Sequence, residues 1–112
     1  MKISVLISVY YKENPLFLDA ALNSIICQTV QPDEIILIED GPLTKELESV
    51  IYKYKTIESK LNNIHLEKNQ GLAKALNIGL KYCKNELIAR MDSDDIAKPT
   101  RFAKQIAIFS AQ

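Results

Sequence analysis

Residues 86–95, ELIARMDSDD, join a mostly apolar run to a cluster of carboxylates. The run from Glu86 to Met91 predicts a buried strand, and Asp92, Asp94 and Asp95 follow it at once. One aspartate suffices for the geometry of a turn, whereas neighbouring carboxylates repel one another. A divalent cation would relieve that repulsion, and magnesium-type ions are often held by one or two carboxylates plus substrate phosphates. The stretch therefore suggests an enzyme that grips a nucleoside diphosphate through a metal.

Strand and helix patterns alternate along the rest of the chain. Apolar runs at 3–9, 34–38, 64–66 and 86–91 predict strands. Helices are predicted after Asn14-Pro15, after the capping residue Thr44, from Leu72 to Cys83, and from Pro99 onward. This alternation implies βαβ units, so the predicted fold class is α/β, with a mainly parallel sheet of about four strands and helices on both faces.

Length and charge restrict the function further. The chain has 112 residues, which suits one domain, and its 14 basic and 14 acidic residues leave no net charge for electrostatic binding of nucleic acid. No apolar run is long enough to span a membrane, and the N-terminus lacks a signal-peptide cleavage site. Cys27 and Cys83 have no metal or redox spacing, so we interpret them as buried, reduced thiols of a cytoplasmic protein.

Polar residues gather where the predicted strands end. They occupy positions 8–11, 39–41, 67–69 and 92–95. In open parallel sheets, ligands bind beyond the carboxyl ends of the strands, at the point where strand order reverses. If strand 3–9 is central, with 34–38 and 86–91 on either side, we expect these ends to share one crevice.

Each polar residue at these ends also has an ordinary structural interpretation. Tyr10 could lie against a base or be a half-buried aromatic residue. Asp40 could accept a hydrogen bond from a base, although by itself it is more typical of a turn. Asn69 and Gly71 precede a predicted helix N-terminus, which can hold phosphate but more often is a plain cap. Lys74 could reach a phosphate, whereas most helical lysines are simply solvated.

Taken in order, several segments resemble family-two glycosyltransferases of the GT-A fold. Residues 4–10, 24–29, 34–41 and 69–79 resemble the opening of that family, and Asp92-Ser93-Asp94-Asp95, followed by residues 98–102, matches its Asp-x-Asp motif. Singly these motifs are common, but in register they are specific. The resemblance implies that residues 1–112 are the N-terminal, nucleotide-sugar-binding portion of the enzyme, a Rossmann-like GT-A half-domain.

The resemblance also implies a reaction. A sugar would pass from a nucleotide-sugar donor, commonly UDP-linked, to a saccharide or lipid-linked acceptor, usually with inversion. Asp94 would coordinate Mn²⁺ or Mg²⁺ bridging the diphosphate, and the metal would neutralise charge on the leaving group. Together with the strand-end argument, the resemblance gives these nucleotide-sugar-binding residues: Ser8, Val9, Tyr10, Asp40, Asn69, Lys74, Asp92 and Ser93.

The sequence departs from the family pattern in two ways. Ser8, Tyr11, Glu39 and Pro42 replace the proline, asparagine, aspartate and serine common in relatives, for which we expect small adjustments of the base pocket. The family's acceptor-binding half and catalytic base lie downstream of the Asp-x-Asp motif. We therefore assign no catalytic base, and expect a chain truncated before that half, which binds donor but has little or no activity. The full-length protein would be cytoplasmic, with a peripheral position at the inner face of the membrane as an option.

Two other classes of protein compete with this interpretation. One is a non-catalytic nucleotide-binding or regulatory α/β domain. The other is a flavodoxin-like receiver, in which Asp40 or Asp92 would accept a phosphoryl group. A receiver should carry its acid pair directly after the first strand, where this chain has Ser8-Val9-Tyr10-Tyr11, so the sequence counts against it.

Overall fold

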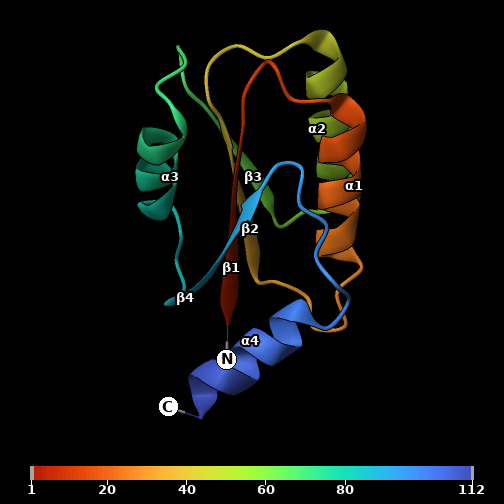
Figure 1. Ribbon diagram of the computed structural model, residues 1–112, viewed down its shortest axis with the longest axis vertical. Coiled ribbons are helices and arrows are strands. Elements are labelled where there is room, and N and C mark those ends of the chain that lie inside the picture. Colours follow the sequence, from red (N-terminus) through yellow and green to blue (C-terminus); the bar gives the residue numbers. More distant parts are fainter. Residues whose placement is uncertain (1, 112) are drawn as a thin grey trace.

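The computed structural model describes residues 2–111, in which strands and helices alternate (Figure 1). The strands are β1 (Ile3–Val9), β2 (Glu34–Glu39), β3 (Leu61–His65) and β4 (Leu87–Asp92). The helices are α1 (Pro15–Ile26), α2 (Lys45–Ile57), α3 (Leu72–Leu80) and α4 (Arg101–Ser110). The predicted α/β class is confirmed.

The four strands form one parallel sheet in the order β3-β2-β1-β4. Strand β1 is central and has β2 and β4 on either side, as the crevice prediction required. In the register of the sheet, Ser8 of β1 lies beside Ile38 of β2 and Asp92 of β4. The carboxyl ends of these three strands therefore lie level, and strand order reverses at β1.

Helices cover both faces of the sheet, as predicted. Figure 1 shows α1 and α2 on one side of the sheet and α3 on the other. Every residue of β1 is buried, and its side chains alternate between two cores. The larger core joins the sheet to α1, α2 and α4, and includes Ile7, Leu18, Leu22, Leu47 and Phe102. The smaller core joins it to α3, and includes Leu6, Ile36, Ile38, Ala75 and Leu76.

Local capping signals were reliable guides to two helix starts. The Asn14 side chain accepts a hydrogen bond from the backbone N–H of Leu16 at 2.9 Å, and Pro15 occupies the first turn of α1. Thr44 caps α2 by accepting from the N–H of Leu47 at 3.2 Å. Both caps satisfy backbone donors that have no partner within the helix.

Four sequence predictions about elements and thiols need correction. Helix α3 ends at Leu80 rather than at Cys83, because the chain turns at residues 81–82. Strand β3 begins at Leu61 rather than at residue 64, and Asn62 and Asn63 lie within it, because this edge strand leaves polar side chains partly exposed. Helix α4 begins at Arg101 rather than at Pro99, after a turn that bonds the Arg101 N–H to the Lys98 carbonyl.

The fourth correction concerns the thiols. Cys27 caps the end of α1 and is exposed, so the prediction that both cysteines are buried was wrong for this one. Cys83 is half-buried, and its burial, followed by the nearby Glu34, raises the pKa of its thiol to about 11.

Candidate functional site

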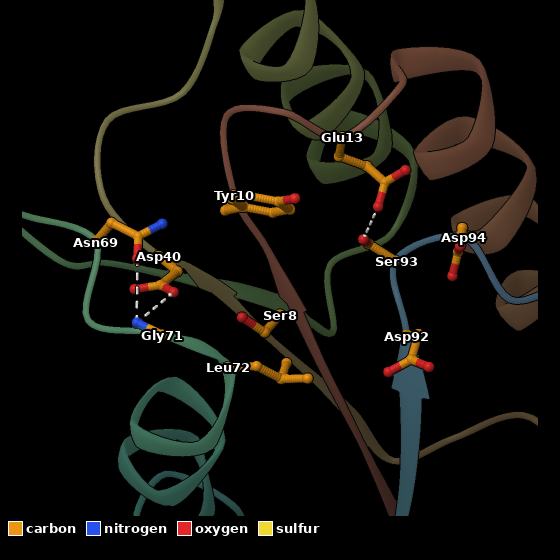
Figure 2. A pocket seen from close by; sticks show the side chains of 10 residues that line it. All are labelled: Ser8, Tyr10, Glu13, Asp40, Asn69, Gly71, Leu72, Asp92, Ser93 and Asp94. Atoms are coloured by element: carbon orange, nitrogen blue, oxygen red, sulfur yellow. Dashed lines mark hydrogen bonds between the residues drawn. The ribbon is translucent and has the colours of Figure 1, made fainter.

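A pocket of about 460 Å³ opens at the carboxyl ends of β1, β2 and β4 (Figure 2). This volume falls within the range of roughly 300–1,000 Å³ that is usual for small-molecule sites. Figure 2 shows Asp40, Asn69 and Gly71 on one side, Glu13 and the acidic segment on the other, and Ser8 and Tyr10 between them. The residues that line the pocket are Ser8, Tyr10, Glu13, Asp40, Asn69, Gly71, Leu72, Asp92, Ser93 and Asp94.

On one side of the pocket, Asp40 holds the loop that leads into α3. The side chain is buried, and its two oxygens accept hydrogen bonds from the N–H groups of Gln70 at 2.7 Å and Gly71 at 3.1 Å. The N–H of Asp40 itself donates to the carbonyl of Val9 at 2.8 Å. Asp40 therefore connects β1, β2 and the start of α3, and its carboxylate retains lone pairs for a ligand.

Gly41 allows the turn after β2 to pack closely against the loop that leads into α3. Its φ of +89° lies in a region that L side chains rarely adopt. A Cβ added at Gly41 would lie 2.6 Å from the backbone nitrogen of Asn69. The turn after β2 consequently packs directly against the loop that carries Asn69, and a larger residue would push this side of the pocket outward.

On the opposite side, Glu13 holds the acidic segment. The hydroxyl of Ser93 donates a hydrogen bond to the Glu13 carboxylate, whose other oxygen accepts from the N–H of Asn14 at 3.1 Å. Ser93 is buried, so its hydroxyl is engaged within the protein. Sequence reasoning missed Glu13, although its place on the loop after β1, just before the Asn14 cap, is at the sheet edge where ligands bind.

The acidic cluster has the geometry of a cation site. One carboxylate oxygen from each of Asp92, Asp94 and Asp95 lies within 4.8 Å of the others, and all three residues are exposed. Metal–oxygen distances of roughly 2.0–2.6 Å allow two ligands of one ion to lie up to about 5 Å apart. The oxygens present therefore fit a hard divalent cation such as Mg²⁺ or Mn²⁺.

Asp95 has an additional structural task in this cluster. Its carboxylate accepts from the N–H of Asp92 at 3.2 Å, and its own N–H donates to the Asp92 carbonyl at 3.0 Å. Asp95 thus closes the turn, whereas Asp92 and Asp94 face the pocket.

The charge in the pocket has one sign. Its lining includes the carboxyl groups of Glu13, Asp40, Asp92 and Asp94 and, among the residues that the structure describes, no lysine or arginine. An anionic ligand such as a diphosphate would be repelled by this lining unless a cation accompanied it. The predicted phosphate contact from Lys74 receives no support, since Lys74 is exposed on α3 outside the lining.

Most of the predicted site residues come together in this one pocket. Seven of the nine line it: Ser8, Tyr10, Asp40, Asn69, Asp92, Ser93 and Asp94. Besides Lys74, the exception is Val9, whose side chain is 1% exposed and lies in the larger core, because successive side chains of a strand point to opposite faces. The prediction that Asp40 and Asp94 flank a single cleft is confirmed. Glu13 and Leu72 were not predicted.

Comparison with known proteins gives the family. A model described as Glycosyl transferase family 2 matches residues 4–112. The chain belongs to glycosyltransferase family 2. This membership rules out the alternative that the chain is a flavodoxin-like receiver. It agrees with the sequence, which has no acid pair directly after β1.

Similar proteins include both an uncharacterised glycosyltransferase and one with a named activity. An uncharacterised glycosyltransferase of Haemophilus influenzae is 49% identical over 107 residues, which are 96% of this chain and 40% of that protein. The UDP-Gal:alpha-D-GlcNAc-diphosphoundecaprenol beta-1,3-galactosyltransferase of Escherichia coli is 50% identical over 101 residues, which are 90% of this chain and 36% of that protein. The chain therefore spans about two fifths of the length of these relatives.

A solved structure confirms the predicted GT-A type of fold. S. aureus TarS 1-349 in complex with UDP-GlcNAc superimposes with a TM-score of 0.85 at 27% identity, covering 99% of this chain and 32% of the TarS 1-349 chain. In the part of the chain that the structure describes, no helix has both the length and the apolar character needed to cross a membrane.

Proposed function

We propose that this chain forms the donor-binding portion of a glycosyltransferase that uses a nucleotide-sugar. The observation that carries the proposal is the single pocket in which Asp40 on one side faces Asp92 and Asp94 on the other, across the reversal of strand order at β1. This is where an open parallel sheet binds nucleotides.

Each side of the pocket has a role in this proposal. Asp40 accepts a hydrogen bond from the base with its free lone pairs, and Tyr10, a residue that is 43% exposed, lies against the base or ribose. Ser8 and Asn69 line the space between base and phosphates. Asp92 faces the ribose or sugar, and Ser93, held by Glu13, keeps the acidic segment turned toward the pocket.

Asp94, supported by Asp92, would hold Mn²⁺ or Mg²⁺ against the diphosphate. The negative lining supports this role, because among the described residues it offers the diphosphate no cationic side chain. When bound, such an ion acts as a Lewis acid that stabilises the charge developing on the leaving diphosphate.

The names of the relatives support a UDP-linked donor and a saccharide or lipid-linked acceptor. The E. coli relative is named for UDP-Gal and a diphosphoundecaprenol acceptor, and the TarS structure contains UDP-GlcNAc. We further propose transfer with inversion, catalysed by a base outside these residues, in a cytoplasmic protein that reaches lipid-linked acceptors from the inner membrane face. Because the chain spans only part of its relatives, we propose donor binding alone for residues 1–112.

Calorimetric titration tests this proposal. UDP, GDP and dTDP would each be titrated with and without Mn²⁺ into the chain, into Asp94→Ala, and into Glu46→Ala as a control that removes an exposed carboxylate on α2, away from the pocket. We expect metal-dependent binding of UDP that Glu46→Ala retains and Asp94→Ala loses. If the parent chain binds none of the three nucleotides, the proposal of donor binding is wrong. If Asp94→Ala binds UDP with Mn²⁺ as tightly as the parent chain does, the metal assignment is wrong.

A further inference from the structure

The segment SIICQT, residues 24–29, takes no part in the pocket, yet it carries two buried polar side chains. Ser24 and Gln28 are 8% and 4% exposed and lie at the end of α1, far along the chain from the acidic cluster. Buried polar groups are costly unless they are hydrogen-bonded, so the partners of these two side chains show what the segment does.

The Gln28 side chain forms hydrogen bonds to the backbone of Lys98 and of Phe102, which lie after the acidic cluster in the sequence. Its Nε2 donates to the carbonyl of Lys98 at 2.7 Å and to that of Ser24 at 3.1 Å, and its Oε1 accepts from the N–H of Phe102 at 3.1 Å. Glutamine can do this because one planar amide offers both donors and an acceptor.

Ser24 forms a similar hydrogen bond to a residue closer in sequence to Asp94 and Asp95. Its hydroxyl accepts from the N–H of Ala97 at 2.9 Å and donates to the carbonyl of Ala21 at 2.7 Å. A backbone bond from the N–H of Thr29 to the carbonyl of Pro99, at 2.8 Å, completes the set.

Besides these bonds, residues 97–102 are held by the packing of Ala97 and Phe102 in the larger core. Residues 93–100 contain no helix or strand, so their place depends on side chains and turns rather than on a hydrogen-bond ladder. Asp94 and Asp95 lie at the start of this irregular stretch, between the end of β4 and the bond to Ala97.

We propose that Ser24 and Gln28 are positioning residues that fix residues 97–102 against α1 and so hold Asp94, within the turn that Asp95 closes, in the lining of the pocket. The functional part of this inference rests on the proposed function, since the placement affects a ligand only if Asp94 holds a metal against a diphosphate. Groups that orient the ligands of a metal change its affinity although they never touch it.

Two variants and a matched control test the inference. Gln28→Met keeps a similar side-chain length but removes the bond to the Lys98 carbonyl, which keeps the Arg101 N–H, and leaves the Phe102 N–H without its side-chain acceptor. Ser24→Ala removes the acceptor for Ala97. Tyr54→Phe is the control, because it removes the hydrogen bonds of the Tyr54 hydroxyl to Asp19 of α1 and none of the bonds that hold residues 97–102.

The first readout is hydrogen–deuterium exchange under conditions in which circular dichroism shows each variant folded. We expect faster exchange at the amides of residues 94–102 in Gln28→Met and Ser24→Ala, with β1 and β2 unchanged, and no such effect in Tyr54→Phe. The second readout is the affinity for UDP with Mn²⁺, which should fall about 10–100-fold in both variants and stay at the parent value in the control.

The outcomes separate the two proposals. If hydrogen–deuterium exchange at residues 94–102 is unchanged in both variants, the inference is wrong, whether or not UDP binds. Faster exchange with parental affinity would overturn the positioning role and leave a role in stability alone. If the parent chain itself does not bind UDP with Mn²⁺, the proposed function fails, while exchange at Asp94 and Asp95 still decides whether Ser24 and Gln28 hold the acidic segment.

Discussion

The hydroxyl of Ser93 donates a hydrogen bond to the carboxylate of Glu13, a residue 80 positions earlier in the chain. The bond joins the loop after β1 to the turn after β4, and both residues line the pocket. It therefore brings the acidic segment toward the end of the central strand.

Glu13→Ala and Ser93→Ala should each weaken binding of UDP with Mn²⁺, because either change frees the acidic turn. The double variant should be little worse than either single one, since both remove the same bond. The coupling energy should be about 1.5–3 kcal/mol, as hydrogen bonds to charged groups usually give. A double-mutant cycle measured by calorimetry checks this, and strictly additive losses would show that the two residues act separately.

Asp40→Asn should destabilise the fold and loosen the loop before α3. The amide can accept a hydrogen bond through only one atom, so its NH₂ group would face the N–H of Gln70 or of Gly71. A buried donor left without a partner costs about 1–3 kcal/mol. Urea denaturation measures the change, and an unchanged free energy of unfolding would mean that these two bonds contribute nothing.

Gly41→Ala should destabilise the chain more than Gly71→Ala. Both glycines have positive φ, of +89° and +93°, so both variants share the backbone strain of about 1–3 kcal/mol. Only at Gly41 would the new Cβ also collide with Asn69, because nothing lies within 4 Å of a Cβ at Gly71. Urea denaturation of the two variants isolates the steric contribution, and equal losses would argue against the close packing at Gly41.

Lowering the pH should remove part of the stability through Asp19. Hydrogen bonds from Tyr54, and then from Lys53, hold the pKa of this carboxyl below its ordinary value of 3.8. A depressed pKa in the folded state means that the stabilisation is complete above the ordinary pKa and is lost as the pH falls through the folded value.

The measurement for Asp19 is the free energy of unfolding of the parent chain and of Asp19→Asn between about pH 5 and about pH 2. The parent should be more stable at the upper end of this range, and the difference between the two proteins should shrink toward the lower end. A difference that stays constant with pH would contradict the assignment.

Features of the fold that depend on neighbouring residues could be read from the sequence. The caps at Asn14 and Thr44 and the apolar run of β1 are local signals, and each indicated the element that the structure contains. The start of β3 could not be read, because Asn62 and Asn63 are tolerated only where the sheet has an edge, and the position of that edge follows from the assembled strand order.

The same distinction applies to the pocket. Residues that directly follow a strand, such as Asp40 and Asp92, could be placed because the carboxyl ends of parallel strands share one edge. The alternation of side chains along β1 could have excluded Val9. The role of Glu13 could not be predicted, since it depends on a hydrogen bond to Ser93, a residue remote in the sequence.

Paramagnetic broadening of backbone amide resonances by Mn²⁺ tests most directly whether one cleft holds both a cation and a nucleoside diphosphate. With UDP present, we predict broadening centred on residues 92–95 that extends to the ends of β1 and β2, together with UDP-induced shifts at Asp40 and Gly71, and neither effect in Asp94→Ala. Broadening centred elsewhere, or UDP shifts that persist unchanged in Asp94→Ala without metal, would contradict the account.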